Sequence, residues 1–228
     1  MVSLAIIPAR GGSKRISRKN VKFFLGKPIV SYSIEVALGS GLFDEVMVST
    51  DDPEIAEVAL ACGAKVPFMR SPETANDFAP LADVIEEVKE KYLALGRSFE
   101  NICCILPTAP LITVESLQKG YELLIGKGAD SVRPLVRFGY AIERALKMTG
   151  EGRVEMLHPE HKYTRSQDLD PAFHDAGQFY WMKSACCLRG DNRFGFEISE
   201  VEAQDIDTEI DWKMAELKYQ YLNQLGRT

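Results

Sequence analysis

The sequence predicts an α/β fold in which helices cover both faces of a doubly wound, mostly parallel sheet. Short apolar runs suited to buried strands alternate with longer amphipathic stretches suited to helices as far as about Pro134. This alternation is typical of parallel sheets, whose neighbouring strands are joined by crossover helices. The length of 228 residues, 46% of them hydrophobic and 26% charged, suits a single domain spanning 1–228.

The alternation gives the expected elements in order along the chain. Strands are expected at 4–8, 45–49, 65–68, 101–106 and 131–136. Helices are expected between and beside them at 28–38, 53–61, 80–95 and 114–125. A return of the chain to the core at 178–182 and a final helix at 208–222 complete the predicted domain.

The pattern breaks between residues 138 and 176. This segment mixes short polar and apolar pieces without a long helical pattern, and Gly150-Glu151-Gly152 is expected to form a hairpin turn. We therefore expect 138–176 to be a small excursion from the sheet, either a lid or a dimer-forming arm.

Composition argues against several classes of protein. The longest apolar runs, such as 4–7 and 102–106, are far shorter than the roughly 20 residues that a membrane-spanning helix needs. The N-terminus lacks the order of a secretory signal, in which charged residues precede an apolar stretch, so we expect a cytoplasmic protein without a membrane partner. The five cysteines include no C-x-x-C pair, which argues against a disulfide framework or a zinc site.

Positive charge is concentrated near the N-terminus of an acidic chain. The net charge is −6, yet residues 1–34 contain no Asp or Glu, and residues 10–27 carry seven Lys or Arg. A concentrated patch suits a small polyanion, whereas a long nucleic acid usually needs a broad basic surface. We therefore expect a phosphate-bearing small molecule and no nucleic acid as the ligand.

The first expected strand runs directly into a glycine-rich basic loop, Ala9 to Arg15. In α/β sheets, ligands bind where loops leave the carboxyl ends of the strands. Gly11 and Gly12 allow backbone N–H groups to turn inward, which forms an anion-binding concavity. The side chains that can add positive charge from the sides are Arg10, Lys14 and Lys19. A bound triphosphate is the functional interpretation, and a solvated basic turn is the alternative.

Two familiar phosphate-binding patterns do not fit this loop. A Walker A loop ends in Gly-Lys followed by Ser or Thr, but Gly26-Lys27 is followed by Pro28. The dinucleotide pattern G-x-G-x-x-G fails because Gly11 and Gly12 are adjacent. Neither a P-loop ATPase nor a Rossmann dehydrogenase is therefore favoured.

An acidic pair near the other end of the chain suggests a metal site. In an extended segment Asp205 and Asp207 point to the same side, so both carboxylates can face one Mg²⁺ bound to a triphosphate. The alternative is helix capping, with Asp207 or Thr208 as the N-cap and Asp211 at capping-box spacing from Thr208. Both interpretations can hold together, because Asp205 is not needed for the cap.

Several motifs in collinear order carry a resemblance that covers nearly the whole chain. They are IIPARGGSKR at 6–15, KN at 19–20, LGKPI at 25–29, STDD at 49–52, RSP at 70–72, LPTAPL at 106–111, RSQDL at 165–169 and DIDT at 205–208. Together they resemble the cytidylyltransferases that activate nonulosonic acids as CMP-sugars.

The resemblance implies a nucleotide-diphospho-sugar transferase-like, Rossmann-like sheet, a homodimer formed through 138–176, and CTP and an acidic nine-carbon sugar as substrates. The implied nucleotide-binding residues are Ala9, Arg10, Gly11, Gly12, Ser13, Lys14, Lys19 and Arg70, and Asp205 and Asp207 would hold Mg²⁺. Arg10, Lys19 and Asp207 would be catalytic. The residues expected to contact the sugar are Arg165, Gln167, His174, Gln178 and Tyr180, although His174 beside Asp175 could equally be structural.

One segment bears on the identity of the sugar. The stretch FHDAGQFYW at 173–181 is similar to the pseudaminic acid cytidylyltransferases of flagellin-glycosylating bacteria, and Leu106 stands where sialic-acid members usually carry Gln. Pseudaminic acid is therefore the expected acceptor, with N-acetylneuraminic and legionaminic acid as alternatives. Two alternatives belong to other classes of protein. The intact basic loop and the paired aspartates disfavour a non-catalytic nucleotide-binding module, and the acidic net charge disfavours a nucleic-acid-binding protein.

Overall fold

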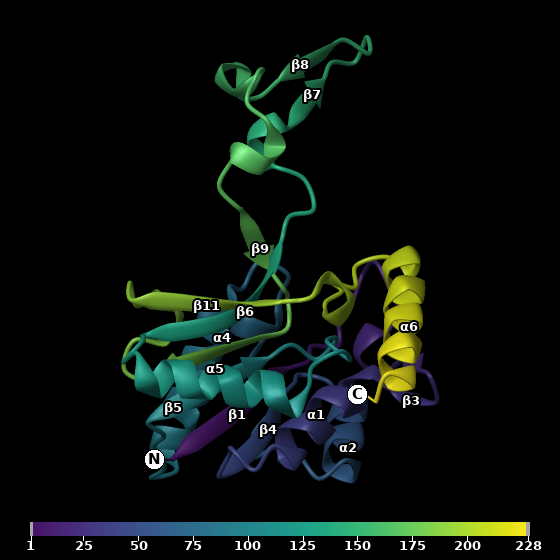
Figure 1. Ribbon diagram of the computed structural model, residues 1–228. Coiled ribbons are helices and arrows are strands. Elements are labelled where there is room, and N and C mark those ends of the chain that lie inside the picture. Colours follow the sequence, from purple (N-terminus) through teal and green to yellow (C-terminus); the bar gives the residue numbers. More distant parts are fainter. Residues whose placement is uncertain (1, 227–228) are drawn as a thin grey trace.

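A computed structural model of the chain, described for residues 2–226, contains a seven-stranded sheet in the order β11-β6-β10-β5-β1-β4, with β9 paired to β6 (Figure 1). The strands of this sheet are β1 (Ser3–Pro8), β4 (Glu45–Ser49), β5 (Asn101–Ile105), β6 (Ser131–Arg137), β9 (Phe173–Asp175), β10 (Phe179–Lys183) and β11 (Arg193–Ile198). Strands β4, β1 and β5 run parallel, and β11 runs parallel to β6. Strands β9 and β10 run antiparallel to their partners, while the other five strands share one direction. The predicted mostly parallel sheet is therefore confirmed.

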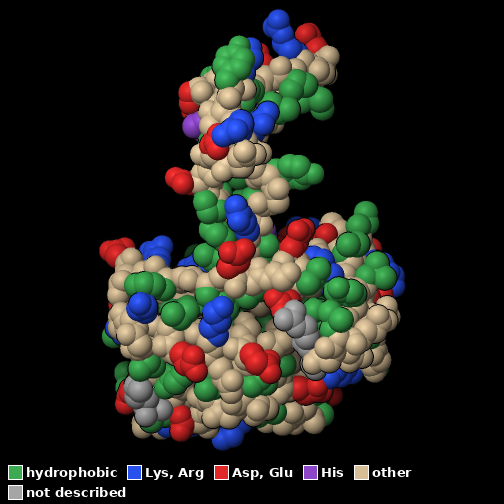
Figure 2. Space-filling model, viewed as in Figure 1, with side chains coloured by type: hydrophobic (Ala, Val, Ile, Leu, Met, Phe, Trp, Pro, Cys, Tyr) green, Lys and Arg blue, Asp and Glu red, His purple; other side chains and the backbone are tan. Residues whose placement is uncertain are grey.

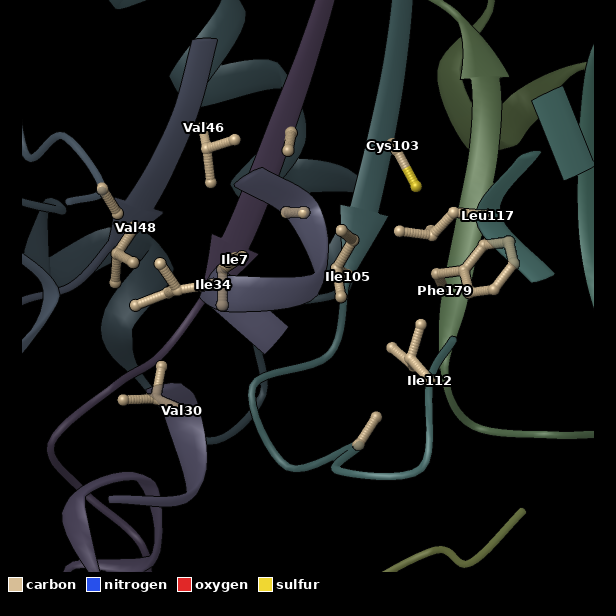
Figure 3. Close-up of a cluster of buried hydrophobic side chains, with 14 of the residues drawn as sticks. Ile7, Val30, Ile34, Val46, Val48, Cys103, Ile105, Ile112, Leu117 and Phe179 are labelled. Atoms are coloured by element: carbon tan, nitrogen blue, oxygen red, sulfur yellow. The ribbon is translucent and has the colours of Figure 1, made fainter. Parts of the chain in front are cut away.

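Helices cover both faces of the sheet, as a doubly wound fold requires. On one face, α1 (Ile29–Gly39), α2 (Pro53–Ala61) and α5 (Val114–Gly126) pack on alternate strand residues such as Ile7, Val48 and Ile105 (Figure 3). On the other face, α4 (Leu81–Ala94) packs on the intervening residues, such as Ile6 and Met47. This alternation follows from the two-residue period of a strand.

The last helix, α6 (Glu209–Gln224), packs beside α1 through a separate cluster that contains Trp212, Phe24 and Tyr32. Its start confirms the capping interpretation, because the Thr208 hydroxyl accepts from the Asp211 N–H and the Asp211 carboxylate accepts from the Thr208 N–H. The cap fixes the direction in which the segment before α6 enters the helix.

Three parts of the sheet differ from the sequence-based expectation. Residues 173–175, expected within the excursion 138–176, form β9 in the sheet because they pair with β6. The strand expected at 65–68 is not formed: Lys65 makes one bridge to Met47, and the chain then leaves the sheet. Pro67 has no N–H with which to continue a ladder. Conversely, β11 was not expected, since Gly195 interrupts its pattern. A Cβ at Gly195 would lie 2.4 Å from Leu135 Cδ1, so glycine permits β11 to lie close against β6.

Between β6 and β9 the chain leaves the body as an arm, residues 138–172, which ends in the hairpin of β7 (Leu146–Met148) and β8 (Val154–Met156) (Figure 1). No residue from 137 to 175 is buried. Figure 2 shows apolar and charged side chains mixed along the arm, which stands clear of the body.

The remaining short elements connect these parts. They are η1 (Lys19–Val21), β2 (Phe23–Phe24), β3 (Lys27–Pro28), α3 (Pro72–Ala75), η2 (Ile142–Arg144), η3 (Pro159–His161), η4 (Ser166–Asp168), η5 (Cys187–Arg189) and η6 (Glu200–Glu202). Within residues 2–226, no helix has the length and apolar character needed to cross a membrane. The five cysteines carry free thiols.

Candidate active site

A cavity of about 590 Å³ opens at the carboxyl ends of β1 and β5. Its walls come from the loop after β1, the segment 70–84 that leads into α4, and the residues Leu106 to Thr108 after β5. The predicted nucleotide-binding residues that line it are Arg10, Ser13, Lys14, Lys19 and Arg70. This is the edge at which parallel α/β sheets bind ligands.

The glycine-rich loop is held against the end of the neighbouring strand β4. The Ala9 N–H donates to the Ser49 carbonyl over 2.9 Å, and the Gly11 N–H donates to Asp51 Oδ1 over 2.9 Å. A Cβ on Gly11 would lie 2.6 Å from Asp52 Oδ2, whereas one on Gly12 would meet nothing within 4 Å. Gly11 therefore permits a close approach to Asp52 that no other residue allows.

Arg70 forms the floor of the cavity. Its side chain is buried, and its guanidinium donates to the Ser49 carbonyl over 2.6 Å and to the Ser49 hydroxyl over 3.1 Å. Burial lowers the pKa of Arg70, while the nearby carboxylates of Asp51 and Glu87 oppose that shift. The guanidinium is thus a fixed positive charge beneath the loop.

Arg10 and Lys14 meet at one carboxylate on the opposite wall. Arg10 Nη1 lies 2.5 Å from Asp77 Oδ1, and Lys14 Nζ pairs with Asp77 Oδ2. Hydrogen bonds from Lys14 and Arg10 lower the pKa of Asp77. The backbone behind Arg10 is also fixed, because the Asn20 amide donates to the Arg10 carbonyl over 2.8 Å.

Lys19 joins the basic loop to the acidic pair near the C-terminus. Its Nζ donates to the Ile206 carbonyl over 2.6 Å and lies 3.8 Å from Asp207 Oδ1. Burial lowers the pKa of Lys19, while Asp207 and Asp205 oppose that shift. Arg15 Nη1 lies 2.7 Å from the other oxygen of Asp207. The two predicted halves of the site, far apart in sequence, are therefore in contact.

Asp205 and Asp207 flank Ile206, whose side chain is fully buried. Partial loss of hydration raises the pKa of Asp205, and the negative charge of Asp207 raises it further. Two carboxylates that repel each other in this way suit a shared cation. Within residues 2–226 no group of three or more His, Cys, Asp or Glu side chains could hold a metal, so phosphate oxygens and water would have to complete the coordination.

The predicted sugar-binding residues of the body separate into accessible and buried groups. His174 is exposed and, with Asp205, lines a second cavity of about 310 Å³. Tyr180 is half-buried under the Arg133 guanidinium, 4.9 Å above its ring, and burial and Asp175 raise its pKa. Gln178 is only 2% exposed and donates to the Glu202 carbonyl over 2.5 Å. His174 and Tyr180 remain accessible, whereas Gln178 is packed inside the protein.

Arg165 and Gln167 lie on the arm. Arg165 pairs with Asp168 at 2.8 Å, and Gln167 lines a cavity of about 940 Å³ formed by arm residues. Neither residue lines the cavity that contains Arg10. A single chain therefore does not bring these two predicted sugar contacts to the nucleotide cavity.

Four contacts at the site were not assigned from the sequence: those of Arg15, Asn20, Asp51 and Asp77. Asp51 lies two residues beyond a predicted strand at the ligand-binding edge, which is a usable signal. Arg15 and Asn20 lie within the predicted basic segment. Asp77 lies in a polar turn with no motif of its own, so nothing in the pattern pointed to it.

The fold agrees with what comparison with known proteins shows. The cytidylyltransferase family model matches residues 4–223, and the chain belongs to this family of nucleotidyltransferases. Among solved structures, CMP:2-keto-3-deoxy-manno-octonic acid synthetase, in complex with CTP, has a similar fold. Its TM-score is 0.71 at 19% identity, and the match covers 98% of this chain and 100% of that one.

Among curated proteins, the relatives include enzymes for several nonulosonic acids. Pseudaminic acid cytidylyltransferase of Campylobacter jejuni is 42% identical over 96% of this chain and 97% of its own length. CMP-N,N'-diacetyllegionaminic acid synthase of Legionella pneumophila is 29% identical, with 97% of each chain covered. N-acylneuraminate cytidylyltransferase A of Danio rerio is 35% identical over 98% of this chain and 52% of its own length.

Proposed function

We propose that this chain transfers CMP from CTP to the anomeric hydroxyl of pseudaminic acid and releases pyrophosphate. The observation that carries this proposal is the 42% identity to a pseudaminic acid cytidylyltransferase over nearly the full length of both chains. The cavity with Arg10, Lys14 and Arg70 supports it independently, because it presents converging cations at the ligand-binding edge of the sheet.

The chain's main contribution is to position the triphosphate. The phosphate oxygens lie among Arg10, Lys14 and Lys19. The N–H groups of Ala9, Gly11 and Ser13 donate within the protein and hold the loop itself. The anomeric oxygen then attacks the α-phosphorus in line, and the bond to the β-phosphate oxygen breaks as pyrophosphate leaves. Such a transfer depends on alignment and charge neutralisation more than on covalent participation of the protein.

Asp205 and Asp207 are the residues that would hold Mg²⁺. When bound, Mg²⁺ would neutralise charge on the phosphate oxygens and lower the pKa of the attacking hydroxyl. The chain prepares this position by fixing the segment through the buried Ile206, the cap at Thr208 and the hydrogen bond from Lys19. Arg15, now paired with Asp207, would have to release that carboxylate.

The acidic sugar would lie beside Asp205, in reach of His174 and Tyr180. The arm supports a homodimer as the working form, because large apolar side chains on it are exposed and have no core of their own. They are Tyr140, Ile142, Leu146, Met148, Val154, Leu157 and Tyr163. In a two-fold dimer, the arm of a second copy could place Arg165 and Gln167 over this chain's sugar site.

A panel of acceptor sugars tests the proposal. The purified protein is incubated with CTP, Mg²⁺ and pseudaminic, legionaminic or N-acetylneuraminic acid, and pyrophosphate release is measured. We expect release with pseudaminic acid at the highest kcat/KM, and a CMP-sugar identified by mass. No release with any of these sugars would overturn the proposal, and CTP binding without turnover would favour the regulatory module instead.

A further inference from the structure

The turn between α3 (Pro72–Ala75) and α4 (Leu81–Ala94) carries a carboxylate into the triphosphate cavity. Asp77 in this turn uses each of its two oxygens for a different cation, Arg10 at 2.5 Å and Lys14 in a second ion pair. Its side chain remains 28% exposed. The pairing joins two walls of the cavity, because Arg10 and Lys14 belong to the loop after β1, far from Asp77 in sequence.

This arrangement has the chemistry of a phosphate contact. Arg and Lys side chains that converge on two oxygens of one anionic group recognise a carboxylate or a phosphate in the same way. Both cations line the cavity that must accept the triphosphate. A nucleotide whose phosphates use Arg10 and Lys14 therefore competes with Asp77 for the same donors.

We propose that Asp77 is an internal stand-in for phosphate, which holds Arg10 and Lys14 until a triphosphate displaces it and thereby sets the affinity for nucleotide. The proposal rests on the nucleotide site of the proposed function. Asp77 acts through the two cations and is a positioning residue. Its effect is confined to ligands that reach Arg10 and Lys14, so it lowers the affinity for nucleotides whose phosphates need these two cations.

The turn is anchored at both ends and exposed in the middle, which allows Asp77 to leave without disturbing the core. Before the turn, Glu87 Oε1 accepts from the Ser71 N–H over 2.8 Å, and its other oxygen accepts from the Thr74 hydroxyl. After the turn, α4 is packed by Ile85 and Val88 in the core. Between them, Phe78 is 93% exposed.

The size of the effect on CTP affinity follows from competition between Asp77 and the phosphates for Arg10 and Lys14. If Arg10 and Lys14 are free for only a fraction of the time, the apparent affinity for a ligand that needs them falls by that fraction. Exposed ion pairs are individually weak. Two pairs on one carboxylate should therefore reduce the affinity for CTP by about three- to tenfold.

The test measures binding of CTP and of cytidine by calorimetry to the wild type and to Asp77→Asn. We expect Asp77→Asn to bind CTP about three- to tenfold more tightly, because no anion has to be displaced. Cytidine, which has no phosphate to compete, should bind both proteins equally. CTP should also raise the melting temperature of Asp77→Asn more than that of the wild type.

Glu73→Gln is the matched control, because it removes the same charge from an exposed residue of α3, four positions away along the chain. We expect it to leave the affinity for CTP within twofold of the wild type. Asp77→Ser serves as a second variant if Asp77→Asn folds poorly. Unchanged or weaker CTP binding by well-folded Asp77 variants, or equal tightening by Glu73→Gln, would overturn the proposal. Failure of the wild type to bind CTP would instead overturn the nucleotide site itself.

Discussion

The phosphate loop and the arm leave the same edge of the sheet, after the parallel strands β1 and β6, yet they are stabilised in opposite ways. The loop is fixed within the chain: Asp51 binds the Gly11 N–H, Asn20 binds the Arg10 carbonyl, and Lys19 binds the Ile206 carbonyl. The arm has no buried residue from 137 to 175. The loop's shape is therefore determined by contacts within one chain, whereas the arm's apolar side chains stay exposed in the chain. This comparison predicts where substitutions should matter.

The largest effect is expected at Gly11, where the loop lies closest to its support. In Gly11→Ala the new Cβ would lie 2.6 Å from Asp52 Oδ2, so the loop or Asp52 must shift. A displacement of about 1 Å in a positioning element can cost on the order of 100-fold in rate. We expect kcat/KM for CTP to fall by about that factor in steady-state pyrophosphate release. Gly12→Ala, which meets nothing within 4 Å, is the control and should lose much less. Full activity in Gly11→Ala would mean that the loop is not fixed by this contact.

The next-largest effect is expected on the free energy of unfolding, at Gly120 of α5 in the core of the body. A Cβ there would lie 2.8 Å from Trp181 Cδ1 and 3.0 Å from Phe179 Cε2, both in the buried cluster. Overpacking of this kind costs about 1–3 kcal/mol, from which alanine recovers about 0.5–1 kcal/mol of helix propensity. Gly120→Ala should therefore lower the free energy of unfolding in urea. Gly126→Ala, on the same helix with open space around it, should raise it slightly. Equal behaviour of the two variants would contradict the packing argument.

A smaller, pH-dependent effect is expected at Glu87, which anchors the segment that carries Asp77. Burial alone would raise the pKa of Glu87, but hydrogen bonds from Lys91, Thr74 and the Ser71 N–H outweigh it and lower the pKa to about 2. Because the folded pKa lies below the ordinary value of 4.5, ionised Glu87 stabilises the fold above pH 4.5, and this contribution is lost as the pH falls toward 2. Glu87→Gln should melt lower than the wild type at pH 7, and the difference should shrink in melting curves below pH 4.5. A constant difference across this range would show that the charge of Glu87 does not contribute.

The sheet was predictable because short apolar strands alternate along the chain with helices that carry apolar faces. The strand expected at 65–68 was wrong because Pro67 ends the ladder, and β11 was missed because Gly195 serves a close approach to Leu135 that appears only in three dimensions. For the site, too, the sequence reveals local features but not contacts that form only in three dimensions. Basic and acidic motifs pointed to Arg10, Lys19 and Asp207, since charge and spacing are visible in the sequence.

The connections between the motifs were not visible in the same way. Asp77 meets Arg10 and Lys14 only because the turn before α4 folds across the cavity, 67 residues away from Arg10 along the chain. Arg165 was expected beside the sugar but lies on the arm, where it pairs with Asp168. Local pattern reveals which residues carry the chemistry. Which residues meet depends on tertiary contacts, and in the proposed dimer the arm would also meet a second chain.

The smallest effect on folding is expected on the arm, at Met148, which is 75% exposed. Because this side chain packs in no buried cluster, Met148→Ser should change the free energy of unfolding of the body by less than about 0.5 kcal/mol. If the arm forms the dimer, the same substitution removes apolar surface from the interface and should weaken association by at least about tenfold, since even a modest apolar contact of 1.4 kcal/mol corresponds to that factor. Sedimentation velocity over a dilution series measures the association.

Leu60→Ser is the control, because Leu60 on α2 is 57% exposed but lies on the body, and it should leave the dimer intact. A wild type that sediments as a monomer at every concentration would remove the arm from any role in dimerisation, whereas loss of stability in Met148→Ser without loss of association would show that the arm is held by its own chain.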